Sequence, residues 1–159
     1  MKIAIFSDTF PPQTNGVSHV VYQSAKNLAD LGHEVIVFTV SKNFLAKQLE
    51  SGIKNLQVIS LPSIPALVYA QERFHIPFSA TYFRLKEFAP DVIHVHTPFG
   101  AGWMGVKSSK KLKVPLVGTH HTFYDYYLKH ARIEYDWAKK FSWKLTVAFY
   151  NRCDLVLSP

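Results

Sequence analysis

The sequence predicts an α/β fold, a doubly wound parallel sheet of the Rossmann-like type. Short apolar runs alternate along the chain with stretches whose apolar residues recur at helical spacing, which is typical of buried strands separated by helices. Such alternation favours parallel strands joined by right-handed crossovers. A chain of 159 residues can bury a core of its own, so we expect one domain over residues 1–159.

The expected strands are short apolar runs that end at turn formers, prolines or polar residues. They cover residues 3–6, 34–40, 56–61, 91–96, 114–119 and 154–157. The expected helices cover residues 17–31, 79–88, 103–112 and 135–151. Residues 41–54 have the spacing of a short amphipathic helix that either faces the core or rests on a membrane. Residues 63–77 begin and end near prolines and are expected to form a loop.

The composition is that of a globular protein, with 48% hydrophobic and 18% charged residues. Cys153 is the single cysteine, which excludes an internal disulfide and fits a reducing compartment. Only one lysine and a short apolar run precede Asp8, so we expect neither a signal peptide nor a membrane-spanning helix at the start. We therefore expect a cytoplasmic protein.

The net charge of +7 lies entirely in the second half of the chain. Residues 103–152 contain ten basic and three acidic residues, interleaved with aromatic residues such as Trp137, Phe141 and Trp143. A basic surface flanked by aromatic rings suits anionic lipid headgroups or nucleic acid. The same residues also fit solvated lysines on helices whose aromatic side chains are core, so both interpretations stay open.

A glycine stands where the first strand leads through a long loop into the first helix. The residues after the strand break it, because Asp8 is a turn former and Pro11 and Pro12 cannot continue a ladder. Asn15 and Gly16 then precede the helical pattern. Because Gly16 has no Cβ, a ligand could approach the N–H groups and the positive dipole end of the helix at this position. This predicts a site for an anion such as phosphate. A simple turn before the helix is the alternative.

The loops that follow the first, fourth and fifth strands are expected to meet. Ligands of doubly wound sheets bind at the carboxyl ends of the strands, where the strand order reverses. With the strand order 3-2-1-4-5, the loops at residues 7–16, 96–102 and 120–129 converge. The second of these loops also leads into a helix through small residues, so we expect its N–H groups to point to the same place.

Four of the eight histidines, His94, His96, His120 and His121, lie near the ends of the fourth and fifth strands. Adjacent His120 and His121 point to opposite sides, so only one of them can face a ligand. A metal site is not expected, because no metal-binding triplet is present. His94 shares a face with His96 but lies deeper, which favours a hydrogen-bonded core histidine. His96 and His121 remain candidates for ligand contact.

The segment after the fifth strand is rich in hydroxyl groups and aromatic rings, which suit a sugar or an amphipathic acceptor. We assign acceptor binding to Phe10, Thr122, Tyr124, Asp125 and Tyr126. Asp125 could act as a base, although a single carboxylate in a loop is more often a cap.

Five segments together resemble the N-terminal half of the retaining glycosyltransferases of the GT-B fold, the glycogen-synthase-like family four. They are KIAIFSDTFPPQTNGVSHVV, GHEVIVFT, DVIHVHTPFGAG, VPLVGTHHTF and CDLVLSP, and they extend over the whole chain. The stretch THHTFYDYY is most similar to the subgroup that glycosylates diacylglycerol, with phosphatidylinositol mannosyltransferases as the next most similar.

The resemblance implies roles for individual residues. In that family the glycine after the first strand lies against the donor diphosphate, and this glycine corresponds to Gly16. We place Asn15 and His96 beside it on the donor side. The histidine followed by threonine after the fifth strand contacts the transferred sugar, which makes His121 the expected catalytic residue. No metal and no cofactor are expected in this domain, only the nucleotide-sugar donor.

The resemblance also implies a reaction, the transfer of a hexose from a nucleotide sugar, UDP-glucose first, to a lipid acceptor such as diacylglycerol. Phosphatidylinositol or a soluble sugar is the alternative acceptor. This chain would be the acceptor-side domain, and we expect it to be almost inactive without the C-terminal donor-nucleotide domain of the family. We further expect a peripheral protein on the inner face of the membrane, with the donor, the lipid, the anionic membrane surface and that second domain as partners.

Two other classes of protein share parts of this pattern. A nucleotide-binding oxidoreductase domain has the same architecture, but the G-x-G-x-x-G motif and an acidic residue at the end of the second strand are missing. A nucleic-acid-binding module would use the basic half of the chain. No recognised motif supports that module, so nucleic acid is not an expected partner.

Overall fold

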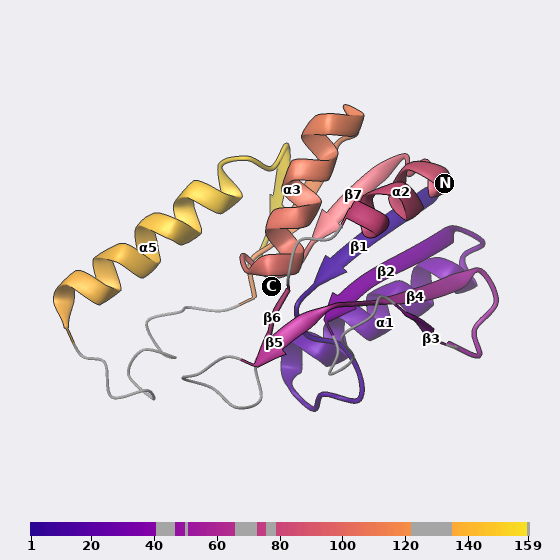
Figure 1. Ribbon diagram of the computed structural model, residues 1–159, viewed down its shortest axis with the longest axis horizontal. Coiled ribbons are helices and arrows are strands. Elements are labelled where there is room, and N and C mark those ends of the chain that lie inside the picture. The colour runs from indigo at the N-terminus through magenta and orange to yellow at the C-terminus, as the bar shows by residue number, and fades with distance from the viewer. Residues whose placement is uncertain (41–46, 50, 66–72, 76–78, 122–134, 159) are drawn as a thin grey trace.

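The fold is a central, mainly parallel sheet with helices on both faces (Figure 1). The structure is a computed structural model that describes residues 1–40, 47–49, 51–65, 73–75, 79–121 and 135–158. The strands are β1 (Lys2–Ser7), β2 (Glu34–Val40), β3 (Lys47–Leu49), β4 (Leu56–Leu61), β5 (Ser63–Pro65), β6 (Arg73–His75), β7 (Val92–Val95), β8 (Leu116–Thr119) and β9 (Leu155–Leu157). The helices are α1 (Gly16–Asp30), α2 (Ser79–Phe88), α3 (Gly100–Leu112) and α5 (Asp136–Tyr150).

The main sheet has the strand order β3-β4-β2-β1-β7-β8-β9. All neighbouring strands are parallel except β3 and β4. The parallel strands therefore follow the expected order 3-2-1-4-5, with the sixth strand next, which confirms the doubly wound fold. The order reverses between β1 and β7. The loops after these two strands consequently leave side by side from the carboxyl edge of the sheet.

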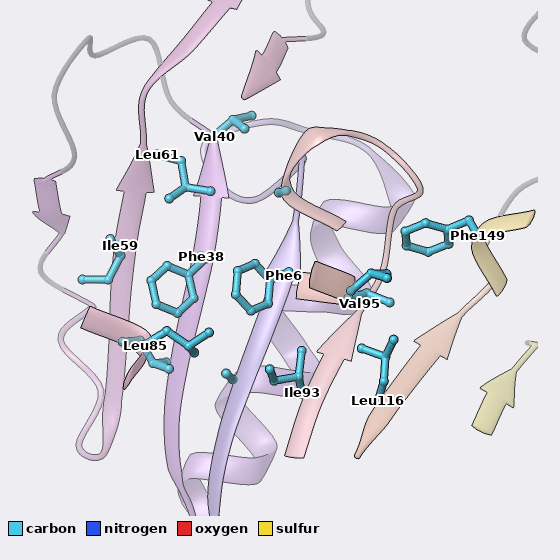
Figure 2. Close-up of a cluster of buried hydrophobic side chains, with 14 of the residues drawn as sticks. Phe6, Phe38, Val40, Ile59, Leu61, Leu85, Ile93, Val95, Leu116 and Phe149 are labelled. Atoms are coloured by element: carbon cyan, nitrogen blue, oxygen red, sulfur yellow. The ribbon is translucent and has the colours of Figure 1, made fainter. Parts of the chain in front are cut away.

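Alternating residues of the central strands fill two separate cores. Ile5 belongs to the core beneath α1. Phe6, the next residue, points to the opposite face and stacks on Phe38 with 4.8 Å between the ring centroids. Figure 2 shows this second core, to which α2 contributes Leu85 and α5 contributes Phe149. Burial on both faces explains why the central strands read as continuous apolar runs.

Two glycines let α3 lie directly on the sheet. A Cβ at Gly102 would stand 1.7 Å from the carbonyl oxygen of Thr97, which is a backbone atom. A Cβ at Gly105 would stand 2.6 Å from Cγ1 of Val95. Side chains at these positions would force α3 away from β7. The start of α3 is therefore held against the loop that follows β7.

The structure corrects the helix expected over residues 41–54. Lys47–Leu49 instead forms β3, an antiparallel edge strand in which Gln48 lies opposite Ile59 of β4. Residues 41–46 and 50 lie outside the described part of the chain. The edge of β4 offers a row of backbone N–H and C=O groups. Pairing with that row outweighs the helical periodicity of so short a segment, because short helices are marginal on their own.

The loop expected over residues 63–77 also contains regular structure. β5 and β6 form a separate two-stranded antiparallel sheet, with Ile64 opposite Phe74. Pro65 lies in β5, and both strands of a two-stranded sheet are edge strands, in which proline is tolerated. α3 begins at Gly100 and not at the predicted Trp103, because the glycines of its first turn weaken the helical signal. In the described part of the chain, no helix is long and apolar enough to cross a membrane.

Candidate functional site

A buried carboxylate connects the loops that follow β1 and β7. Asp8 directly follows β1, and its side chain accepts hydrogen bonds from Thr97 Oγ1 at 2.6 Å and from the N–H of Ala101 at 2.9 Å. The N–H of Asp8 in turn donates to Thr97 Oγ1 at 2.9 Å. These bonds join segments that lie about ninety residues apart in the sequence. The first two of the three expected loops therefore do meet.

The carboxylate of Asp8 changes what the start of α3 can bind. Ala101 lies in the first turn of α3, and its N–H is occupied by Asp8. The negative charge also lies at the positive end of the helix dipole. We expected this helix start to offer its N–H groups to a ligand, and at Ala101 an internal anion takes that place. The sequence interpretation treated Asp8 as a turn former, although a carboxylate just after a buried strand is a signal for a site at the carboxyl edge.

The start of α1 remains open. Asn15 is the N-cap, and its Oδ1 accepts from the N–H of Ser18 at 2.8 Å while its Nδ2 donates to Thr9 Oγ1 at 2.7 Å. The amide of Asn15 therefore serves the loop itself. Gly16 is exposed, and a Cβ built on it would meet no atom of the described residues within 4 Å. The fold itself gives no reason for glycine at this position, so the open space in front of the helix is available to a ligand.

Three imidazoles form a column that reaches from the sheet to the loop after β8. The ring centroids of His94 and His96 lie 4.0 Å apart, and Nε2 of His94 is 2.7 Å from Thr119 Oγ1. Nδ1 of His96 is 2.8 Å from Nε2 of His121, and the planes of the two rings differ by 15°. His120 instead packs edge-on against Tyr150 of α5 at 5.2 Å. The two adjacent histidines diverge, as their alternation in the sequence predicted.

The histidine column and the start of α1 lie on the same face of the sheet. His94 lies opposite Ile5 of β1, and residues paired in this way point to the same side. Ile5 belongs to the core beneath α1, so His94 and His96 project to that side. His121 joins them through its contact with His96. Gly16 and the His96–His121 pair are therefore on one face, at the carboxyl edge.

Burial keeps the column neutral. It lowers the pKa of His94 to about 4 and the pKa of His96 well below its ordinary value of 6.5, with smaller contributions from neighbouring histidines. Burial and the proximity of His120 also lower the pKa of His121, which is half-buried. At pH 7 the site therefore contains uncharged imidazoles. They act as hydrogen-bond donors and acceptors and not as fixed positive charges.

Of the residues expected to bind the acceptor, only Phe10 lies in the described part of the chain. Phe10 is 7% exposed and packs edge-on against Tyr22, within the core beneath α1. Its described contacts are those of a core residue, and acceptor binding by Phe10 stays a prediction. The other expected acceptor residues, Thr122, Tyr124, Asp125 and Tyr126, lie outside the described residues. Within the described ranges, no group of three or more His, Cys, Asp or Glu side chains could hold a metal ion.

The fold is that of the GT-B glycosyltransferases. The structure resembles sucrose-phosphate synthase from Thermosynechococcus elongatus with a TM-score of 0.56 and 16% sequence identity, over 98% of this chain and 41% of that one. At this identity the likeness shows the fold alone. Residues 14–159 match the profile of Glycosyltransferase Family 4, and the chain belongs to that family.

Curated relatives include two alpha-monoglucosyldiacylglycerol synthases. The one from Streptococcus pneumoniae is 30% identical over 82% of this chain, and the one from Acholeplasma laidlawii is 30% identical over all of it. A GDP-mannose-dependent alpha-mannosyltransferase from Corynebacterium glutamicum is 21% identical over the full chain. The chain spans 29%, 40% and 38% of the lengths of these three relatives, respectively.

The neutral histidine column predicts a loss of stability in acid. The unfolded state binds a proton at His94 below about pH 6.5, whereas the folded state resists protonation down to about pH 4. Stability is therefore fully present above pH 6.5 and falls as the pH drops through this window. We expect His94→Gln, whose amide can still reach Thr119 Oγ1, to reduce the loss of unfolding free energy between pH 7 and pH 5 by about 1–2 kcal/mol.

The measurement is urea unfolding of the wild type and the His94→Gln variant at both pH values. Equal unfolding free energies at pH 7 would show that the substitution leaves the fold intact. Carboxylates contribute to acid sensitivity in both proteins, so the difference between the two pH dependences isolates His94. An identical loss in both proteins would contradict the assignment of a neutral, buried His94.

Proposed function

We propose that this chain is the acceptor-side domain of a retaining glycosyltransferase that transfers a hexose from a nucleotide sugar to a membrane lipid. UDP-glucose and diacylglycerol are the first candidates, because two relatives at 30% identity are alpha-monoglucosyldiacylglycerol synthases. The chain spans well under half of those relatives. A further domain that binds most of the donor nucleotide is therefore part of the proposal.

The observation that best supports the proposed donor site is that the start of α1 is open and lies on the same face of the sheet as the His96–His121 pair. The first N–H groups of a helix have no partner within it. The side chain of Asn15 accepts a hydrogen bond from the N–H of Ser18. The N–H groups of Gly16 and Val17 are then left for the diphosphate. The helix dipole favours the negative charge that grows on the diphosphate as it departs.

In the proposed reaction this domain stabilises the leaving group and holds the sugar. The bond between the anomeric carbon and the diphosphate breaks, a bond to the acceptor oxygen forms on the same face of the sugar, and the proton of the acceptor hydroxyl passes to the departing diphosphate. The α1 N–H groups stabilise the leaving group, and His121 holds a sugar hydroxyl in place. Because the imidazole of His121 is neutral at pH 7, it places no positive charge beside the oxocarbenium-like state.

The mannosyltransferase relative supports a second candidate. That protein is GDP-mannose-dependent, and it is 21% identical to this chain over the full length of this chain. Transfer of mannose, with phosphatidylinositol or a soluble sugar as the acceptor, would use the same Gly16 and His121. Membership of Glycosyltransferase Family 4 leaves the oxidoreductase alternative without support.

The function is tested by joining residues 1–159 to the remaining part of the Acholeplasma laidlawii relative and assaying transfer to diacylglycerol micelles. We expect transfer from UDP-glucose by the joined protein and almost none by residues 1–159 alone. Gly16→Ala is expected to lower kcat/KM for the donor by about tenfold or more, equivalent to about 1.4 kcal/mol, because its Cβ would occupy the space in front of the helix.

Val20→Ala is the matched control, because Val20 is exposed on the same helix. It should retain the activity of the unsubstituted protein. The Gly16→Ala protein should unfold at the same or a higher temperature, since alanine favours helix more than glycine does. Full activity in Gly16→Ala would remove the proposed donor site, and preference for GDP-mannose would select the second candidate.

The proposed membrane surface is the exposed face of α5, a helix at the edge of the molecule (Figure 1). Trp137, Phe141 and Trp143 are 69%, 58% and 56% exposed. Lys140 and Lys144 are also exposed and lie one helical turn apart on the same helix. Large aromatic side chains beside lysines suit the interface of an anionic bilayer. This arrangement supports binding of the domain to the membrane that contains its acceptor.

A double variant, Lys140→Gln with Lys144→Gln, tests this surface by vesicle sedimentation. We expect its binding to anionic vesicles to weaken by about 2 kcal/mol, or about thirtyfold, at low salt. Lys26→Gln with Lys86→Gln removes the same charge from α1 and α2 and serves as the control. Equal weakening by both double variants, or equally strong binding to neutral vesicles, would contradict the proposal.

A further inference from the structure

We propose that His96 is a positioning residue that donates a hydrogen bond from Nδ1 to Nε2 of His121 and so presents the Nδ1–H of His121 to the substrate. The inference rests on the proposed function for the identity of the substrate. The proposal specifies which nitrogen of each of the two imidazole rings holds the proton. This role differs from direct donor contact, because His96 is only 2% exposed.

His96 is held in place from several directions. Its backbone N–H donates to the carbonyl oxygen of Phe6 at 3.0 Å, which fixes the backbone at the end of β7. Its ring packs on His94, and His94 is anchored to Thr119 Oγ1. His121 is half-buried and is the outermost ring of the column. A fixed inner ring and a partly exposed outer ring are the arrangement expected of a support and the group that it orients.

The direction of the hydrogen bond follows from an orphan nitrogen. A distance of 2.8 Å between Nδ1 of His96 and Nε2 of His121 requires one N–H and one lone pair. Nε2 of His96 is buried and has no hydrogen-bond partner among the described residues. If the proton of His96 were on Nε2, that N–H would be buried without an acceptor. An unsatisfied buried acceptor is more common than an unsatisfied N–H, so the proton belongs on Nδ1.

The consequence is a defined tautomer for His121. Its Nε2 accepts from His96, so the proton of its neutral ring is on Nδ1. Burial lowers the pKa of both rings, which keeps this arrangement intact at pH 7. His121 therefore offers an uncharged N–H donor to an oxygen of the bound sugar. Without His96, the ring could rotate and exchange between tautomers, and the donor would be lost for part of the time.

The test is a long-range ¹H–¹⁵N NMR spectrum of the histidine rings at pH 7, assigned with a His121→Gln variant. We expect the Nδ1 of His121 to have the shift of a protonated ring nitrogen and its Nε2 that of a bare one. Protonated Nε2 on His121 in the wild type would overturn the proposal directly. This measurement needs no substrate, so it stands apart from any failure of the transferase assay.

Two variants separate positioning from structure. His96→Asn places an amide near the site of Nδ1, and we expect it to preserve the tautomer of His121 and most of the donor kcat/KM in the joined protein. His96→Leu removes the donor, and we expect mixed tautomers and a loss of about tenfold or more in kcat/KM. A Leu variant with an unchanged His121 spectrum would refute the role. If that variant fails to fold, the wild-type spectrum still decides the question.

Discussion

The structure of the site depends on one buried carboxylate. Asp8 binds Thr97 Oγ1 and the N–H of Ala101, and these bonds hold the loop after β1 against the loop after β7 and the start of α3. A charge that is removed from water is tolerated only where hydrogen bonds replace its hydration. The position of Asp8 therefore determines where both loops run. Because Asp8 occupies the N–H of Ala101 at the start of α3, we assign the ligand to the start of α1.

The histidine column adds direction to this opening. Each imidazole is fixed by the one beneath it, beginning with the bond between His94 and Thr119 at the end of the sheet. Because burial keeps the rings neutral, the column supplies oriented hydrogen bonds without adding positive charge. Diphosphate recognition by a helix start and sugar recognition by an imidazole are then assigned to different elements of the same sheet face. This division is consistent with a chain that belongs to Glycosyltransferase Family 4.

The sequence predicted the parts of the fold that depend on burial. Continuous apolar runs identified the parallel strands, the order 3-2-1-4-5 expected of a doubly wound sheet is confirmed, and alternation separated His120 from His121. The predictions missed the short strands within segments 41–54 and 63–77, because β3 depends on the edge of β4, and β5 and β6 depend on each other, not on their own periodicity. Asp8 was missed as a link for a similar reason. Its partners are about ninety residues away, and no local pattern reports such a contact.

We propose that the start of α1 and His121 contact one nucleotide sugar. The most direct measurement is a crystal structure of the chain, joined to its donor-nucleotide domain, with UDP-glucose bound. We expect a diphosphate oxygen about 3 Å from the backbone nitrogen of Gly16 or Val17, and a sugar oxygen at a similar distance from Nδ1 of His121. A donor that touches neither group, or that lies on the α3 face of the sheet, would contradict it.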